Sequence, residues 1–185
     1  MRLILTFALV AILTGCAAAG YHETGPLASG TPAAAAPKAS ATSPNVDLAF
    51  PAGWQTKHPT NWQRTAGMVI QASNNTTNST VIVIAVDATG LTDRNAYMLN
   101  RRAAQESRLK DATHSDVTDV TVNGRPGKQF EVTGTNFEGV RVTFLYTAIF
   151  GHVELVVVNA WTTAANYNDQ KAAFQWLAER VSGIQ

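Results

Sequence analysis

Between residues 117 and 161 the chain alternates short stretches of β-branched and aromatic residues with turns built on glycine. The pairs Asn123-Gly124, Glu138-Gly139 and Gly151-His152 punctuate these stretches. Glycine adopts positive φ without steric cost, so such pairs are typical of tight hairpin turns. Connections this short can join only antiparallel neighbours. The sequence therefore predicts an antiparallel meander with strands at 117–122, 129–133, 140–150 and 153–161.

Three more strands are predicted upstream, at 46–50, 68–72 and 81–86. The last of them runs from Val81 to Val86 without polar alternation, which indicates burial on both faces and a central position in the sheet. Residues 55–64 are polar and are predicted to form a loop. The predicted fold class is α+β, with an antiparallel β-sheet of about six to seven strands flanked by helices.

Two helices complete this pattern. The first is predicted to begin at a Thr92 or Asp93 cap and to run to about Lys110. Its predicted apolar stripe consists of Ala96, Leu99, Ala103 and Leu109. Its predicted solvent-facing side consists of Arg94, Arg101, Arg102, Glu106 and Arg108. The second helix is predicted to begin near Thr163 and to run to the C-terminus. One core cluster between sheet and helices is expected to contain Val83, Phe144, Val156 and Leu177.

The first sixteen residues resemble an export signal. Arg2 precedes an apolar run from Leu3 to Leu13, which is shorter than the roughly 20 residues of a membrane span. Leu13-Thr14-Gly15-Cys16 resembles the lipobox of bacterial lipoproteins, in which the cysteine thiol receives a diacylglyceryl group and residues 1–15 are removed. The alternative is a plain secreted protein with a chance cysteine near the cleavage site.

The lipobox resemblance also implies a cellular location. A lipoprotein attached through Cys16 would be held at a membrane of the bacterial envelope and would face the periplasm. In lipoproteins of Gram-negative bacteria, a residue such as Ala17 after the cysteine favours the outer over the inner membrane. Residues 16–45 are rich in Ala, Pro and Ser and lack an apolar face, so they are predicted to be a disordered tether before one domain at 46–185.

The charge balance excludes several partners. The chain has 14 Lys and Arg against 13 Asp and Glu, and removal of residues 1–15 takes away Arg2 and leaves 13 of each. A neutral chain lacks the basic footprint of a nucleic-acid-binding domain, so no nucleic acid is expected. The sequence has no polybasic run for lipid headgroups either, so membrane attachment is expected through the lipid on Cys16. Cys16 is the only cysteine, which excludes an internal disulfide.

Four segments of the domain carry a second resemblance: Phe50-Pro51-Ala52-Gly53-Trp54, Val81–Val86 with Asp87, Val122-Asn123-Gly124, and Leu177–Ile184. Together with the order of strands and helices, they resemble the PsbP-like α/β/α sandwich, and specifically the small DcrB-like periplasmic lipoproteins. The resemblance covers essentially all of 46–185. It implies a fold, an envelope location and a non-enzymatic binding or scaffold role, and it carries over no site residue.

The residues themselves show little chemistry. The sequence has no nucleophile elbow, no zinc-protease motif and no phosphate-binding loop. The histidines at positions 22, 58, 114 and 152 are not spaced as metal ligands on a helix. Ser107, His114 and Asp116 can be drawn as a triad, and Asp111, Asp116 and Asp119 as a calcium site, but both sets fit solvated polar residues better. No catalytic residue, metal or cofactor is therefore predicted.

Tryptophans supply the one candidate recognition surface. Trp54 and Trp62 lie at the two ends of the polar segment 55–64, where they form either a recognition surface or a lid over the core. Trp161 and Trp176 are predicted to be core or core-edge residues.

Three functions from different classes follow. The first is a lipid-anchored, non-catalytic binding or scaffold module that contacts another envelope protein. The second is a small-ligand carrier with a pocket between sheet and helix, which a deep apolar cavity lined by Trp54 or Trp62 would favour. The third is a hydrolase with an unorthodox site, which needs a nucleophile and a base that converge from distant segments.

Overall fold

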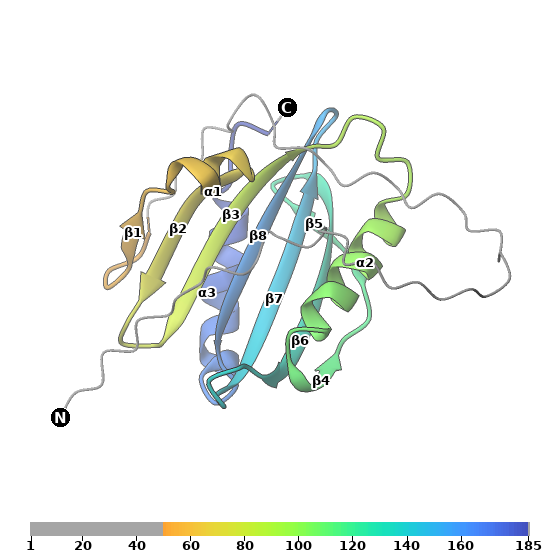
Figure 1. Ribbon diagram of the computed structural model, residues 1–185. Helices are drawn as coiled ribbons and strands as arrows, with labels where there is room; N and C mark the ends of the chain where they lie inside the picture. The colour runs from red at the N-terminus through yellow and green to blue at the C-terminus, as the bar shows by residue number, and fades with distance from the viewer. Residues whose placement is uncertain (1–49, 185) are drawn as a thin grey trace, which may run out of the picture. The chain divides into compact units, whose positions relative to one another are not determined.

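A computed structural model describes residues 50–184, apart from the side chains of Trp62 and Thr65. The predicted signal, Cys16, the tether and all of the predicted first strand except Phe50 lie outside the described residues. Eight strands and three helices follow one another along the chain (Figure 1). In order they are β1 Gln55–Lys57, α1 Asn61–Thr65, β2 Met68–Asn74, β3 Ser79–Asp87, α2 Arg94–Glu106, β4 Lys110–His114, β5 Thr118–Val122, β6 Arg125–Thr135, β7 Arg141–Phe150, β8 Glu154–Thr163 and α3 Tyr167–Glu179.

The strands form one antiparallel sheet in the order β1-β2-β3-β8-β7-β6-β4, with β5 also paired to β6. This confirms the α+β class and the predicted meander β5-β6-β7-β8. The strand number is eight rather than six to seven, because the sequence pattern missed β4 and assigned β1 and α1 to a loop. Both missed strands are short and mostly exposed, so they lack the apolar alternation by which strands are recognised.

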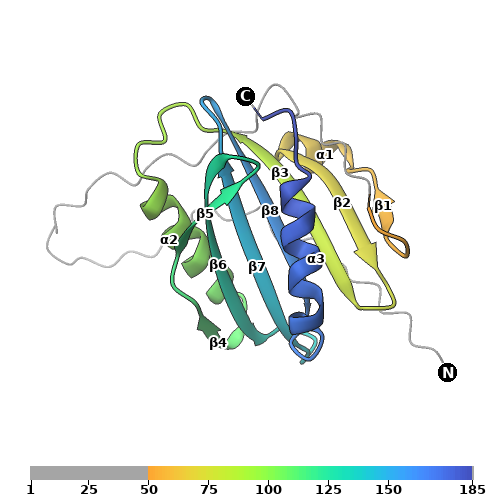
Figure 2. The same cartoon turned by 180° about the vertical axis from the view of Figure 1, so that it is seen from behind.

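Helices cover the two faces of the sheet, α2 on one and α3 on the other (Figures 1 and 2). Successive side chains of a strand point to opposite faces. Along β8, Val156 and Val158 pack in the cluster that includes Leu177 of α3, whereas Leu155 and Val157 pack in the cluster that includes Met98 of α2. The core therefore lies in two layers, one on each side of the sheet.

Strand β3 occupies the interior position predicted from its unbroken apolar run. It pairs with β2 on one side and with β8 on the other, and Val81 and Val83 are fully buried. Residues 75–78 form the turn from β2 to β3, where Thr162 and Asn166 both donate hydrogen bonds to the carbonyl oxygen of Thr77.

The buried face of α2 differs from the predicted stripe. The Asp93 cap is confirmed, since its carboxylate accepts a hydrogen bond of 2.8 Å from the Ala96 amide. The buried residues, however, are Tyr97 and Met98, while Leu99 is 38% exposed. Tyrosine and methionine side chains cover more of the sheet than the alanines of the predicted stripe, and their larger burial sets the rotation of the helix.

The predicted core cluster is correct for three of its four members. Val83, Val156 and Leu177 pack together under α3. Phe144 lies instead on the α2 face, because it is two residues before Tyr146 in β7 and alternate side chains of a strand point to the same face. Its ring stacks on that of Trp161, with 5.5 Å between the ring centroids.

Helix α3 begins later than predicted, because Thr163 still pairs with Val142 in the sheet. It also ends earlier, at Glu179, and the chain beyond it returns Val181 and Ile184 to the core in a non-helical segment. Asn123, in the β5–β6 turn, fixes this segment by donating a hydrogen bond from its side-chain amide to the carbonyl oxygen of Glu179.

Candidate functional site: a polar groove beside helix α3

Helix α3 divides its face of the sheet into two unlike parts. Phe174 and Leu177 point into the core, and the 3.6-residue period places Lys171 and Gln175 on one flank of the helix and Trp176 on the other. Figure 2 shows the helix between β5 and β6 on one side and β2 on the other. The flank toward β5 and β6 borders a polar groove.

The groove consists of two adjoining hollows of about 330 and 380 Å³ that meet at Gln129. The first is lined by Val120, Thr121, Val122, Gln129, Thr147, Gln175, Ala178 and Glu179. The second is lined by Ser115, Asp116, Thr118, Gln129, Phe130, Glu131 and Lys171. Strand β5 and the segment before it form one wall, α3 forms the other, and β6 with β7 forms the floor.

Strand alternation makes this floor polar. Phe130 and Val132 of β6 point toward α2, so Gln129 and Glu131 point toward α3. Gln129 lies opposite Thr147 of β7 in the register and donates a hydrogen bond of 2.8 Å from its amide nitrogen to the threonine hydroxyl. The floor is thus a set of hydrogen-bonding groups held on two rigid strands.

An ion pair spans the groove. Lys171 Nζ of α3 lies 2.7 Å from Glu131 Oε1 of β6. The Tyr167 hydroxyl is buried beside this pair, and burial, followed by the charge of Glu131, raises the pKa of Tyr167 well above its ordinary value. The lining contains three carboxylates, at Asp116, Glu131 and Glu179, against the single ammonium of Lys171, so its formal charge is −2.

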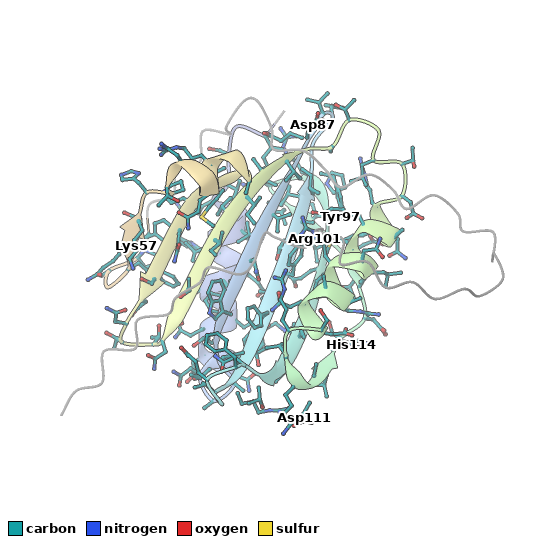
Figure 3. All side chains as sticks on the ribbon, in the orientation of Figure 1. Lys57, Asp87, Tyr97, Arg101, Asp111 and His114 are labelled. Carbon is teal, nitrogen blue, oxygen red and sulfur yellow. The ribbon has the colours of Figure 1, made fainter. Side chains whose placement is uncertain are left out.

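The α2 face has a second polar cluster around Arg101, a residue that the sequence pattern placed on the solvent-facing side of the helix. Arg101 Nε donates a hydrogen bond of 3.1 Å to the Tyr97 hydroxyl. The electrostatic interaction of its guanidinium with Tyr146 raises the pKa of Arg101. Burial raises the pKa of Tyr146 well above its ordinary value. Figure 3 shows Tyr97 and Arg101 together over the sheet beside α2. These groups stabilise the packing of α2 and line neither hollow of the groove.

Comparison with known proteins then gives the family. The family model described as probable lipoprotein LpqN matches residues 29–178. The chain belongs to the LpqN lipoprotein family. This membership places the protein in the cell envelope and confirms the lipoprotein prediction, with LpqN as the family where the resemblance had pointed to DcrB-like proteins. A search of curated proteins found no match.

Three solved structures are similar to this LpqN-family protein, and one of them supports its fold. The cyanobacterial PsbP (CyanoP) of Synechocystis sp. is similar with a TM-score of 0.57 and 14% identity, over 84% of this chain and 98% of that one. LpqN of Mycobacterium tuberculosis, described as involved in cell envelope biogenesis, is similar with a TM-score of 0.48 and 15% identity, over 74% of this chain and 79% of that one. A putative regulator of unknown function from Pseudomonas aeruginosa is similar with a TM-score of 0.47 and 13% identity, over 55% of this chain and 69% of that one. The CyanoP likeness confirms the PsbP-like fold.

The polar residues singled out in the LpqN-family sequence do not assemble into a reactive site. His114 Nδ1 lies 2.8 Å from Glu106 Oε1 of α2, and the Ser107 hydroxyl donates a hydrogen bond to the carbonyl oxygen of Ala104. Asp116 lines the groove, and Asp119 pairs with Lys128 at 2.7 Å. Among residues 50–184 no three His, Cys, Asp or Glu side chains are grouped as metal ligands.

Trp54 is half-buried, packs against the core cluster under α3 and lies 5.8 Å from Phe50, ring centroid to ring centroid. Trp62 belongs to α1, and its side chain lies outside the described part of the chain. Trp161 is a core residue and Trp176 a core-edge residue, as predicted: Trp176 is half-buried, packs against the core cluster under α3, and has the guanidinium of Arg180 over its ring at 4.2 Å. Neither hollow of the groove is lined by Trp54.

The groove residues were missed because they belong to no motif. The available signal was the alternation Gln129-Phe130-Glu131-Val132, in which two polar residues point to a face that a helix partly covers.

Over the part of the chain that the structure describes, helices are too short or too polar to cross a lipid bilayer.

Proposed function

We propose that this protein is a lipid-anchored, non-catalytic binding module of the bacterial envelope. Cys16 carries the lipid, the domain faces the periplasm, and the outer membrane is favoured because Ala17 follows the cysteine. Membership of a lipoprotein family supports the anchor. The involvement of the M. tuberculosis relative in cell envelope biogenesis supports a role in the same process.

The acidic groove beside α3 is the observation that carries a binding role. It presents amide, hydroxyl and carboxylate groups on two strands and a helix, and rigid placement lowers the entropy lost on binding. From Lys171 to Glu179 the helix wall is about 12 Å long, which matches an extended segment of about four residues. We therefore propose that the occupant is a polar segment with lysine or arginine from another envelope protein.

A small-ligand carrier is the second candidate, and the size of the groove favours it. Hollows of about 330 and 380 Å³ fall within the usual range for ligand sites. Their mixed polar lining would suit a polar ligand rather than the apolar one that a tryptophan-lined cavity would take. The groove lining contains no histidine or cysteine, so a hydrolase would need a base of another kind there.

Crosslinking in intact cells tests the proposal. A photoreactive residue at Gln175, in the wall of the groove, should form an adduct with one envelope protein. The same residue at Leu99, exposed on the opposite face of the sheet, is the matched control and should give none. Charge reversal at Asp116 and Glu179 together should remove the adduct. Equal adducts from both positions, or an adduct that survives charge reversal, would contradict a protein-binding groove. A bound small molecule released on denaturation would favour the carrier.

A further inference from the structure

We infer that the β1 edge of the sheet docks on an anionic lipid surface and so orients the domain on the membrane. The inference rests on the lipid anchor of the proposed function. It concerns the opposite edge of the sheet from the groove, because β1 begins the strand order and β6 lies near its other end.

Charge is distributed unevenly between the two edges. From Phe50 to Val86 the chain contains Lys57, Arg64 and His58 but no Asp or Glu. The opposite edge mixes the two signs: three aspartates, at positions 111, 116 and 119, lie among the lysines at 110 and 128, and Asp119 pairs with Lys128. Figure 3 shows Lys57 at the β1 edge and Asp111 at the far end of the sheet. The chain as a whole is close to neutral, so its cationic residues are available for an anionic surface only where the fold separates them from carboxylates.

Aromatic side chains accompany these cations. Phe50 and Trp54 form a pair beside β1, and both remain half-buried. Trp176 lies on the flank of α3 away from the groove, with the Arg180 guanidinium over its ring. Tryptophan beside lysine or arginine is the combination enriched at membrane–water interfaces, where the ring sits at headgroup level.

The chain enters the domain at this edge. Phe50 is the first described residue, and it lies 34 positions after Cys16, from 50 − 16. If residues 16–45 form the tether predicted from their sequence, a chain of that length would have an end-to-end distance of about 30 Å and would keep the domain at a high local concentration over the bilayer. A weak surface contact is then enough to select one orientation.

Strand β1 favours lipid over a protein strand as the occupant. All three of its residues are exposed, and within the described part of the chain it pairs only with β2. A three-residue strand with a lysine is a poor template for adding another strand. Headgroup phosphates, in contrast, accept hydrogen bonds from its outer amides and from Lys57 without any register.

Hydrogen exchange of the lipid-modified protein on vesicles tests this inference. On vesicles of phosphatidylcholine with phosphatidylglycerol, amides in 54–64 should exchange at least about threefold more slowly than on pure phosphatidylcholine. Lys57→Gln with Arg64→Gln should remove this difference. Lys128→Gln, at the opposite edge, is the matched control and should leave it unchanged.

Equal exchange on the two vesicles, or a difference that survives the double substitution, would overturn the inference. So would slowing that requires added envelope proteins, because it would assign the edge to a protein partner. The intact mass of the same sample reports acylation separately. If the mass shows no lipid, the anchor fails, and exchange of the unmodified protein with and without added anionic vesicles still decides the docking surface.

Discussion

The guanidinium carbon of Arg101 lies 5.4 Å from the centroid of the Tyr97 ring, and its Nε donates a hydrogen bond to the hydroxyl of the same residue. The two side chains are one helical turn apart on α2, and together they cover the sheet near Tyr146. A cation held in this way adds both a charge-assisted hydrogen bond and the packing of its aliphatic stem.

Arg101→Ala should therefore lower the free energy of unfolding by about 1–3 kcal/mol, since it removes the hydrogen bond and the stem together. Urea unfolding followed by circular dichroism measures the change. Arg94→Ala is the matched control, because Arg94 is exposed and its guanidinium carbon lies 4.7 Å from the centroid of the Phe150 ring. Equal losses for the two variants would contradict a special role for Arg101.

Leu177→Ala should cost about 2–5 kcal/mol, because Leu177 is fully buried between α3 and the sheet and truncation leaves a cavity. Leu99→Ala, on the exposed side of α2, should change stability by less than about 0.5 kcal/mol. Thermal melts of both variants compare the positions. If Leu177→Ala melts at the wild-type temperature, the placement of α3 is wrong.

Two glycines with positive φ separate backbone strain from steric overlap. Gly67 and Gly90 have φ of +85° and +84°. A Cβ on Gly67 would overlap the carbonyl oxygen of Ala85, whereas a Cβ on Gly90 would meet no atom within 4 Å. Gly90→Ala should cost about 1–2 kcal/mol, and Gly67→Ala about 3 kcal/mol or more. Denaturant midpoints measure both, and similar losses would mean that the overlap is relieved.

The buried tyrosines predict a loss of stability at alkaline pH. Burial raises the pKa of Tyr146 and of Tyr167 above the value of about 10 that tyrosine has in an unfolded chain. Below pH 10 both states keep the phenolic protons, so the contribution of these residues is complete. As the pH rises further, the unfolded state releases protons first and stability falls. Phenolate absorbance from these residues should appear only together with the loss of circular dichroism.

In Tyr146→Phe and Tyr167→Phe, the phenolate signal that coincides with unfolding should become smaller. A variant that leaves this signal unchanged would show that the replaced tyrosine titrates in the folded protein.

Cys16→Ser should abolish lipid attachment, because only the thiol accepts the diacylglyceryl group in this interpretation. The domain should fold unchanged, since the substitution lies 34 positions before Phe50. Metabolic labelling with a fatty acid and membrane fractionation measure the two effects. Label and membrane association that both survive the substitution would exclude the lipoprotein anchor.

The strand order could be predicted largely from sequence, because the responsible signals are local. The unbroken run Val81 to Val86 indicates an interior strand, and turns such as Asn123-Gly124 permit only antiparallel pairing. The Asp93 cap is equally local, since one carboxylate satisfies an amide three residues later.

The rotation of α2 and the groove could not be predicted in this way. A stripe through Ala96 and Leu99 matches helical spacing as well as the true one, and only the sheet beneath selects Tyr97 and Met98. Gln129 and Lys171 are unremarkable surface residues in sequence; they become neighbours of one groove because α3 returns over β7 and β8 and lies beside β6. Both features depend on tertiary contacts, which no local pattern contains.

Five inter-strand steps separate β1 from β6, and at about 4.8 Å per step they amount to about 24 Å. With the β1 edge on the headgroups, the groove would stand at that height above the bilayer. A partner embedded in the same leaflet would then need a periplasmic extension of similar reach, whereas a partner that spans the periplasm would meet the groove directly.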